Sequence, residues 1–269
     1  MSWPNNLEFC IVDFETTGLY VQYGDRVVEY AYIVVKNGDI IERGESLVNP
    51  NRLMNPEATA KNRITDDMLI GKPPFNQVGE ELWNAINGRI FVAHNARFDL
   101  SCLAYECKKV GWKQPDFNAI DSIKLSRHFW TGQSSYNLET LANLVGHKWS
   151  GEAHRAMADV KALFSVMNVL FHQFPSRLNS LNEILNIGGI EKTEVKVLSK
   201  MNMSKKAQIL QQNIGIAINI QYQSNSTGLT NRLITPRDLF AINDAEFVSA
   251  TCHNSITIKT FRLDRMNLL

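Results

Sequence analysis

Two carboxylates, Asp13 and Glu15, stand two residues apart at the end of the apolar segment 8–14. We expect that segment to be a buried strand, and side chains at positions i and i+2 of a strand point to the same face. Neighbouring carboxylates repel each other and lose hydration unless a positive charge compensates them. Hard oxygen ligands suit Mg²⁺ or Mn²⁺. The pair therefore predicts a metal site, and the alternative is a solvent-exposed acidic strand end.

Three more residues of matching chemistry occur later in the chain: Asp99, His154 and Asp159. Asp99 falls in the first turn of a helix expected over 96–110, where an acid also complements the helix dipole. Asp159 continues the apolar stripe of a helix expected over 155–174 and so points inward, where an unpaired carboxylate is costly. About 140° of rotation separates His154 from Asp159 on a regular helix. We therefore expect His154 in the loop that precedes the helix, either beside the acids or as a simple polar cap.

A mixed α/β sheet is the predicted scaffold for these five residues. Strands are expected at 8–14, 27–35, 39–48 and 90–93, and helices at 56–70, 75–87, 96–110, 137–146, 155–174 and 177–187. Strands that first form hairpins and then alternate with helices favour a mixed sheet flanked by helices. Such a sheet would place each of the acids at a strand end or near a helix start.

A shift in composition after Pro175 predicts a second domain. Residues 176–269 carry eleven Lys and Arg against seven Asp and Glu, a net charge of +4, whereas residues 1–175 carry 17 against 20. This uneven distribution of charge indicates an acidic metal site joined to a basic partner-binding region. The alternative is that the charged residues are scattered at random. Strand-like runs at 216–223, 229–235, 246–252 and 256–263 predict a small β-barrel. We therefore divide the chain into domain 1–175, linker 176–206 with a short helix, and barrel domain 207–269.

The composition excludes several classes of protein. With 44% hydrophobic and 20% charged residues, the chain is not disordered throughout, collagenous or a coiled coil. Its four cysteines form no C-x-x-C pair and match no zinc template, which favours a reduced intracellular protein. No continuous apolar stretch approaches the length of a membrane span, and the first residues contain no secretory leader. We therefore expect a cytoplasmic protein with no membrane contact.

In this order, the four acids and the histidine resemble the DEDDh (DnaQ-like) exonuclease superfamily, whose last motif is H-x-x-x-x-D. That branch includes epsilon subunits of bacterial replicases, ribonuclease T and exodeoxyribonuclease X, and the resemblance covers residues 7–174. Further segments that resemble the family are Ile64-Thr65 with Met68-Leu69, Tyr136-Asn137-Leu138 and, as in exodeoxyribonuclease X, 124–127 with Trp130. The chain departs from many relatives at 61–63, where Lys-Asn-Arg stands in place of a histidine and a glycine.

The resemblance implies an RNase H-like fold and a 3′-to-5′ exonuclease with two Mg²⁺ or Mn²⁺ ions per site. The implied reaction releases nucleoside 5′-monophosphates from single-stranded 3′ ends of DNA. Asp13 would bridge the two ions, Glu15 and Asp159 would complete one site, and Asp99 would hold the second. His154 would be the general base, because imidazole titrates near neutral pH.

Further residues are implied to contact the terminal nucleotide: Thr16, Thr17 and Gly18 after the first motif, with His94 and Phe98 of the second. RNA 3′-end trimming is an alternative, because no residue separates it from DNA degradation. The alternative of another class is a regulatory nucleic-acid-binding protein that keeps the fold as a scaffold. The four acids and the histidine of the family motif are all intact, which argues against a role as a scaffold alone.

The last fifty residues resemble the end of WYL domains, which fold as small Sm-like β-barrels. The matching segments are 232–236 (R-x-I-x-P) and 259–266, whereas the tripeptide that names the family is absent near Glu246-Phe247-Val248. The resemblance implies nucleic-acid or nucleotide sensing. Candidate phosphate contacts are Arg232, Arg237, Arg262 and Arg265, with ordinary surface arginines as the alternative. We expect nucleic acid as the partner, DNA in preference to RNA, and a homo-oligomer or a replication or repair protein as further candidates.

Overall fold

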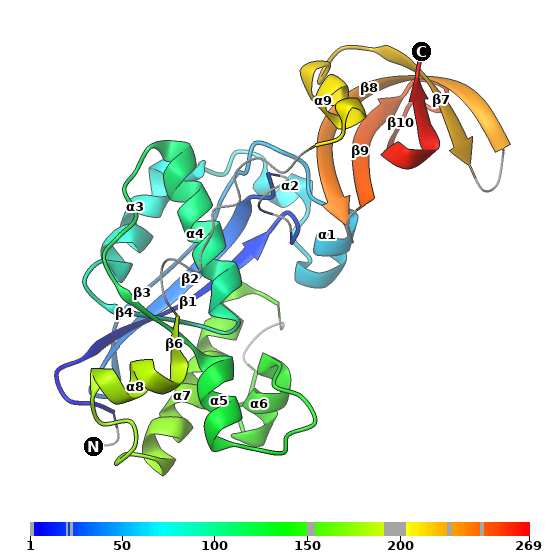
Figure 1. Cartoon of the computed structure of the whole chain (residues 1–269). Coiled ribbons are helices and arrows are strands. Elements are labelled where there is room, and N and C mark those ends of the chain that lie inside the picture. Colours follow the sequence, from blue (N-terminus) through cyan, green and yellow to red (C-terminus); the bar gives the residue numbers. More distant parts are fainter. Residues whose placement is uncertain are drawn as a thin grey trace.

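The computed structural model describes residues 3–19, 21, 24–149, 154–190, 203–224, 228–242 and 245–269. Figure 1 shows two sheets, a larger one flanked by helices and a smaller one formed by the C-terminal strands. Part of the predicted linker, residues 191–202, lies outside the described residues. None of the described helices is both long and apolar enough to cross a membrane.

The larger sheet is mixed, as the sequence predicts, and has six strands. Their order is β3 (Asp39–Leu47), β2 (Val27–Lys36), β1 (Glu8–Thr16), β4 (Ile90–Ala93), β5 (Asn118–Asp121) and β6 (Gly189–Ile190). Strand β1 is antiparallel to β2 and parallel to β4, and β4 is parallel to β5. Strand β1 therefore lies inside the sheet, with its two acids near its carboxyl end.

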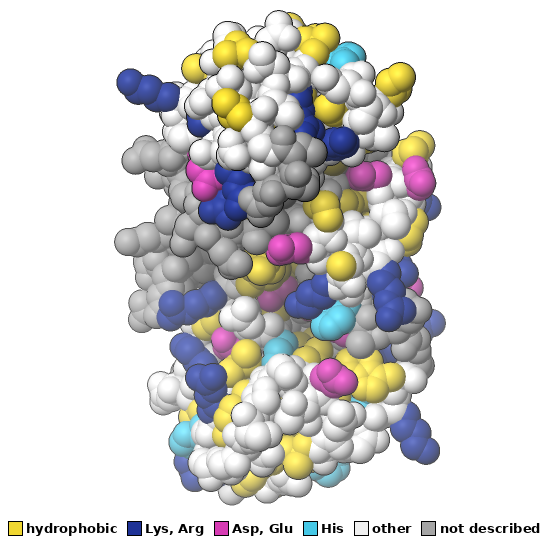
Figure 2. Space-filling model, turned by 90° about the vertical axis from the view of Figure 1, so that its right-hand side faces the viewer, with side chains coloured by type: hydrophobic (Ala, Val, Ile, Leu, Met, Phe, Trp, Pro, Cys, Tyr) yellow, Lys and Arg dark blue, Asp and Glu magenta, His cyan; other side chains and the backbone are white. Residues whose placement is uncertain are grey.

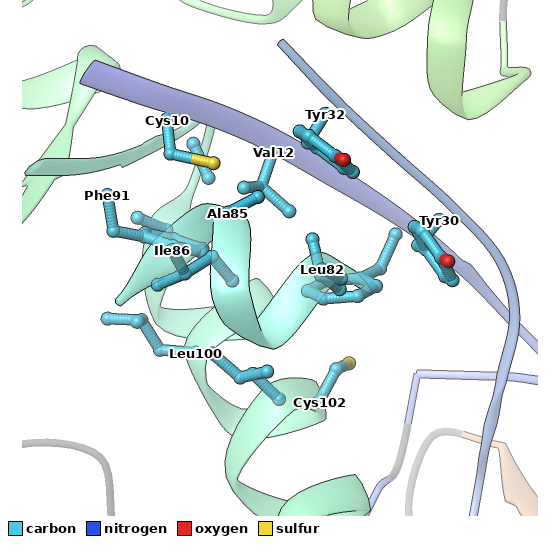
Figure 3. Close-up of a cluster of buried hydrophobic side chains, with 14 of the residues drawn as sticks. Cys10, Val12, Tyr30, Tyr32, Leu82, Ala85, Ile86, Phe91, Leu100 and Cys102 are labelled. Atoms are coloured by element: carbon cyan, nitrogen blue, oxygen red, sulfur yellow. The ribbon is translucent and has the colours of Figure 1, made fainter. Parts of the chain in front are cut away.

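Helices cover both faces of this sheet because the residues of β1 alternate between two cores. Cys10 and Val12 belong to the core that includes α3 (Phe75–Ile86) and α4 (Ala96–Val110), which Figure 3 shows. Phe9 and Ile11 belong to the other core, which α7 (Ala156–Gln173) covers. Helices that extend this second layer are α5 (Ser122–Phe129), α6 (Leu138–Leu144) and α8 (Leu181–Gly188).

The single helix predicted over 56–70 is wrong, because two helices occupy this range. Helix α1 (Pro56–Asn62) ends at Arg63, whose φ of 59° is left-handed and whose N–H donates to the Thr59 carbonyl. Helix α2 (Asp66–Leu69) follows. The break turns the Asn62 amide inward, where it donates to the Thr16 carbonyl at 3.3 Å, and it buries Ile64 completely.

Strand β5 and helix α5 were not predicted, because β5 has only four residues and the helix begins directly after it. Helix α8 begins at Leu181 rather than at 177, because the Ser180 hydroxyl caps it by accepting from the Glu183 N–H. It continues into β6, which pairs with β5. The chain up to residue 190 therefore packs on the larger sheet, with Leu178 and Ile184 completely buried.

The smaller sheet is antiparallel, in the order β10 (Thr257–Arg262), β9 (Ala245–Cys252), β8 (Gly228–Ile242), β7 (Ile218–Ser224) and β11 (Met266–Leu268). The four predicted strands are present, whereas β11, α9 (Lys205–Gln212) and the short 3₁₀ helix η3 (Leu263–Arg265) were not predicted. In the described part of the chain the outer strands β10 and β11 do not pair with each other, so a closed barrel is not confirmed.

Candidate active site

Three of the predicted acids meet at the carboxyl end of β1. Asp13, Glu15 and Asp159 each offer a carboxylate oxygen, and these oxygens lie within 4.8 Å of one another. The first two share one face of β1, and Asp159 comes from the first turn of α7, which packs across that strand. All three side chains are half-buried. The structure therefore gathers them as the strand and helix periodicities predict.

Asp99 approaches the same pocket from the first turn of α4, where it is 3% exposed. It lies outside the three-residue cluster, yet after burial its charge has the largest effect on the pKa of Asp13. The preceding Asn95 adopts a left-handed φ of 69°, and its N–H donates to the Asp121 carboxylate at 3.2 Å. The end of β5 thus fixes the start of α4 and, with it, Asp99.

Burial and mutual repulsion make the charged forms of these acids costly. Burial raises the pKa of Asp13 well above its ordinary value, and the nearby charges of Asp99 and Glu15 raise it further. Burial, followed by the charge of Asp159, raises the pKa of Glu15 to about 8. The pKa of Asp99 also lies well above its ordinary value because of burial, although backbone hydrogen bonds oppose the rise.

The donor set fits a hard divalent cation. The cluster offers only carboxylate oxygens, the ligands that Mg²⁺ and Mn²⁺ prefer. A bound cation would favour the ionised carboxylates that burial and repulsion disfavour. Among the described residues, Asp13, Glu15 and Asp159 are the group of acids, histidines and cysteines close enough to hold one ion together.

His154 lies immediately before α7, in the loop position that the sequence predicts. It is exposed, its φ of 64° is left-handed, and its backbone N–H donates to the Asp159 carboxylate at 3.3 Å. Burial raises the pKa of Asp159, and this hydrogen bond opposes the rise. The left-handed turn keeps the imidazole off the helix, so that it lines the pocket beside the acids.

A single pocket of about 860 Å³ contains the acids and most of the predicted substrate contacts. Thr16, Gly18, His94 and Phe98 line it, whereas Thr17 does not. Thr17 is completely buried behind the pocket wall, and its hydroxyl donates to Asp25 at 2.8 Å. This geometry therefore does not favour direct contact between the Thr17 side chain and the substrate.

His94 uses both ring nitrogens within the protein. Its Nε2 donates to the Tyr136 carbonyl at 2.9 Å, since a carbonyl only accepts, so Nδ1 accepts from the Ser122 hydroxyl at 2.8 Å. Burial lowers the pKa of His94, which is consistent with this neutral ring. His94 therefore holds the Tyr136 wall of the pocket in place.

Two basic residues of the pocket were not among the predicted contacts: Lys61 and Arg127. The Arg127 guanidinium lies over the Tyr136 ring, 5.4 Å from its centre. Figure 2 shows lysines and arginines beside a hollow that contains acidic side chains. Lys61 lies in the last turn of α1, far from the acids in the sequence, so no local pattern could place it here. Arg127 belongs to a segment that resembles exodeoxyribonuclease X, which was the available signal.

All four C-terminal arginines lie outside the acidic pocket: Arg232, Arg237 and Arg262 on strands of the smaller sheet, and Arg265 in η3. Arg232 is held over the rings of Tyr222 and Phe261, 5.7 Å from each centre. Arg262 pairs with Asp264 at 3.0 Å, whereas Arg237 and Arg265 are exposed. Phe261 is buried in the core of the sheet.

Two family models match the chain: Exonuclease over residues 10–167 and WYL domain over residues 215–269. The 3'-5' exonuclease DinG of Bacillus subtilis is 32% identical over 177 residues, which cover 66% of this chain and 18% of that protein. A PolC-type DNA polymerase III of Staphylococcus aureus is 34% identical over 154 residues, 57% of this chain and 11% of the polymerase. The chain thus spans less than a fifth of either relative.

Solved structures share the fold. Exonuclease X in complex with 5' overhanging duplex DNA is 26% identical, with a TM-score of 0.54 over 66% of this chain and 98% of that one. The zinc-bound E. coli ExoI–ssDNA complex matches 90% of this chain and 54% of its own, with a TM-score of 0.58. Because the two sequences are 19% identical, the match to ExoI is evidence of a shared fold alone.

Proposed function

This chain belongs to the Exonuclease family, and from that premise we propose that it is a 3′-to-5′ exonuclease that uses two Mg²⁺ or Mn²⁺ ions. The proposed reaction hydrolyses phosphodiester bonds of DNA from single-stranded 3′ ends and releases nucleoside 5′-monophosphates. The observation that carries the proposal is the convergence of Asp13, Glu15 and Asp159 in one pocket with Asp99. The family matches also confirm the predicted resemblances to DnaQ-like nucleases and WYL domains.

We assign the metal ligands as the sequence predicts. In this assignment Asp13 would serve both metal sites, Glu15 and Asp159 would complete one of them, and Asp99 would hold the second. When bound, the ions supply charge neutralisation at the phosphate, a more acidic water and stabilisation of the leaving oxygen. The charges of Asp99, Glu15 and Asp159 all act on Asp13, which supports this division.

His154 is the proposed general base. It removes a proton from the water whose oxygen attacks phosphorus, while the bond between phosphorus and the 3′-oxygen breaks and that oxygen takes up a proton. The exposed His154 lines the pocket from outside α7, so its imidazole can change orientation without disturbing that helix. Its backbone bond to Asp159 keeps it beside a proposed metal ligand.

The terminal nucleotide is proposed to contact Thr16, Gly18 and Phe98, with His94 acting through the Tyr136 wall. Lys61 and Arg127 are suited to bind phosphates that flank the scissile one. DNA is the proposed substrate because the relatives include a DNA polymerase and an exonuclease bound to duplex DNA. One fold neighbour is described as a 3′-exonuclease that recognises a histone mRNA stem-loop, so RNA belongs in the test.

The C-terminal strands form a proposed second domain that binds nucleic acid through its arginines. We place the end of the catalytic domain at residue 190 rather than 175, because α8 and β6 pack on the larger sheet. An Sm-like barrel, a cytoplasmic location, and self-association or a replication or repair partner stay predictions of the sequence.

The test uses end-labelled single-stranded DNA, duplex DNA and RNA of one sequence, with Mg²⁺, with Mn²⁺ and with excess chelator. We expect stepwise loss of 5′-mononucleotides from the 3′ end of single-stranded DNA, only with a metal. The Asp13→Ala variant should be inactive. Internal cleavage, or equal cleavage in chelator, would overturn the proposal. Faster degradation of RNA than of DNA would make RNA the substrate.

A further inference from the structure

The turn that follows the first acidic motif is fixed by buried contacts on its far side. The Thr17 N–H donates to the Arg26 carbonyl at 2.9 Å, and the Arg26 N–H donates to the Thr17 hydroxyl at 3.1 Å. The Asn55 N–H donates to the Thr17 carbonyl at 3.0 Å. Because Thr16 and Gly18 line the pocket on either side of Thr17, any shift of Thr17 moves the pocket wall.

A buried carboxylate, Asp25, supports this turn. It is 1% exposed, and its Oδ1 accepts from the Thr17 hydroxyl at 2.8 Å. It also fills the space beside Gly18, since a Cβ there would lie 2.4 Å from Asp25 Oδ2. Gly18 is thus required for the approach of Asp25. The position of Asp25 therefore sets the position of the turn.

Arg52 compensates the charge of Asp25. Its Nη2 lies 3.5 Å from Asp25 Oδ1, and the two side chains are 9% and 0% exposed. A buried carboxylate without a partner is costly, so this pair holds both groups in place. Arg52 belongs to the loop before α1, and the turn belongs to the end of β1.

The same nitrogen of Arg52 donates to the Leu239 carbonyl on β8 at 2.8 Å. Strand β7 pairs with β8 only from Gly228 to Ile234, so the later residues of β8 have an edge that β7 does not cover. A register shift between Pro236 and Asp238 directly precedes Leu239. In Figure 1 the ends of β8 and β9 lie beside α1, close to where this loop joins it.

We propose that Arg52 is a positioning residue through which the C-terminal domain sets the Thr17–Gly18 turn and, with it, the fit of the 3′-terminal nucleotide. The contacts run from Leu239 through Arg52 and Asp25 to Thr17. The inference rests on the proposed exonuclease function. None of these residues belongs to the acidic cluster, so binding of the terminal nucleotide depends on them while the chemical step does not.

The first experiment measures KM and kcat on a trinucleotide for the full chain with Arg52→Ala, Arg52→Lys and Asp25→Asn. Arg43→Ala, an exposed arginine on β3, is the control. We expect Arg52→Ala and Asp25→Asn to raise KM about tenfold, a usual coupling between sites, with kcat within about twofold. Arg52→Lys keeps the charge, but the lysine Nζ lies one bond nearer the backbone than the Nη2 that makes both contacts. It should therefore restore the melting temperature and not KM. Unchanged KM in Arg52→Ala, or full rescue by lysine, would overturn the proposal.

The second experiment follows amide hydrogen exchange and needs no activity, so it separates this proposal from the exonuclease assignment. In Arg52→Ala we expect faster exchange both at 17–18 and at 237–242, and in Arg43→Ala at neither. Faster exchange at 17–18 alone would place the role of Arg52 within the catalytic domain and refute the coupling. If the unsubstituted chain lacks nuclease activity while both segments respond, the proposed function fails and the coupling stands.

Discussion

The carboxylate of Glu29 on β2 holds the guanidinium of Arg155 at the start of α7, through hydrogen bonds of 2.5 to 3.2 Å. Its Oε2 also accepts from the Ala156 N–H at 3.0 Å. Glu29 is 4% exposed and lies opposite Glu15 in the β1–β2 register. One buried side chain therefore fixes the first turn of the helix that carries Asp159 and the residue that follows His154.

The first prediction concerns Glu29→Gln. The amide has one acceptor oxygen and no charge, so it holds Arg155 and the Ala156 N–H less firmly, and Asp159 loses its fixed position. Groups that orient metal ligands typically contribute about 10–100-fold to affinity or activity. We expect kcat/KM to fall by that factor and the metal concentration for half-maximal rate to rise.

Glu42→Gln is the matched control for Glu29→Gln. Glu42 also pairs with an arginine, Arg89, but it lies on β3 outside the pocket. Titration of activity with Mn²⁺ for both variants gives the comparison. Equal metal dependence in the two variants would mean that Glu29 does not position the site.

The second prediction concerns stability without metal. Glu15 has a pKa of about 8 in the folded protein against an ordinary value of 4.5, and the pKa of Asp13 is also raised. Raised carboxyl pKa values stabilise the fold fully below the ordinary value, and that contribution is lost as pH rises through the folded value. In chelator, the contribution of these acids should therefore lower the melting temperature as the pH rises from about 4.5 to about 8.

Added Mg²⁺ or Mn²⁺ should reverse this fall, and most strongly at the alkaline end, because the ions bind the ionised carboxylates of the folded state. Asp13→Asn should melt higher than the unsubstituted chain in chelator and should respond less to metal. Thermal unfolding at several pH values, with and without metal, measures both effects. The metal site is refuted if the two ions leave the melting temperature unchanged at pH 8.

The third prediction tests the proposed base. His154→Ala should reduce kcat by about 10²–10⁴-fold, the usual contribution of a general base. KM should change little, because the imidazole is exposed and its backbone N–H, rather than its ring, binds Asp159. His172→Ala, on the exposed side of α7, is the control. A His154→Ala enzyme with normal kcat from pH 6 to 9 would remove His154 from the mechanism.

The acidic site was predictable because each acid stands at a position that local periodicity defines. Asp13 and Glu15 follow the period of a strand, and Asp159 follows an apolar helical stripe. Glu29 was missed, although a signal was present: before the terminal Lys36 it is the one charge in the strand Val27–Lys36, whose other residues are apolar and buried. Strand patterns of this kind imply that any charge within them has a buried partner.

Contacts between distant segments were not predictable. Arg52 and Asp25 lie in turn-like segments without periodicity, and the contact of Arg52 with Leu239 depends on how the smaller sheet meets the larger one. The single helix predicted over 56–70 failed for a related reason, because the left-handed Arg63 serves a tertiary contact of Asn62. Helix propensity carries no information about such a contact.

The last prediction concerns the C-terminal arginines. Arg237 and Arg265 are exposed, whereas Arg232 is held over two aromatic rings and its removal would disturb their packing. We therefore replace Arg237 and Arg265 by alanine in the full chain, with Asp13→Ala to prevent cleavage. Each phosphate contact on a single strand contributes about 0.7 to the slope of log affinity against log salt. The double replacement should lower the slope by up to about 1.4 on a long oligonucleotide and leave the binding of a trinucleotide unaffected.

The control is Lys108→Ala with Lys113→Ala, which removes the same charge from an exposed region outside the pocket. Equal slopes for the two pairs would mean that these arginines act only through net charge, and the smaller sheet would then not hold the strand.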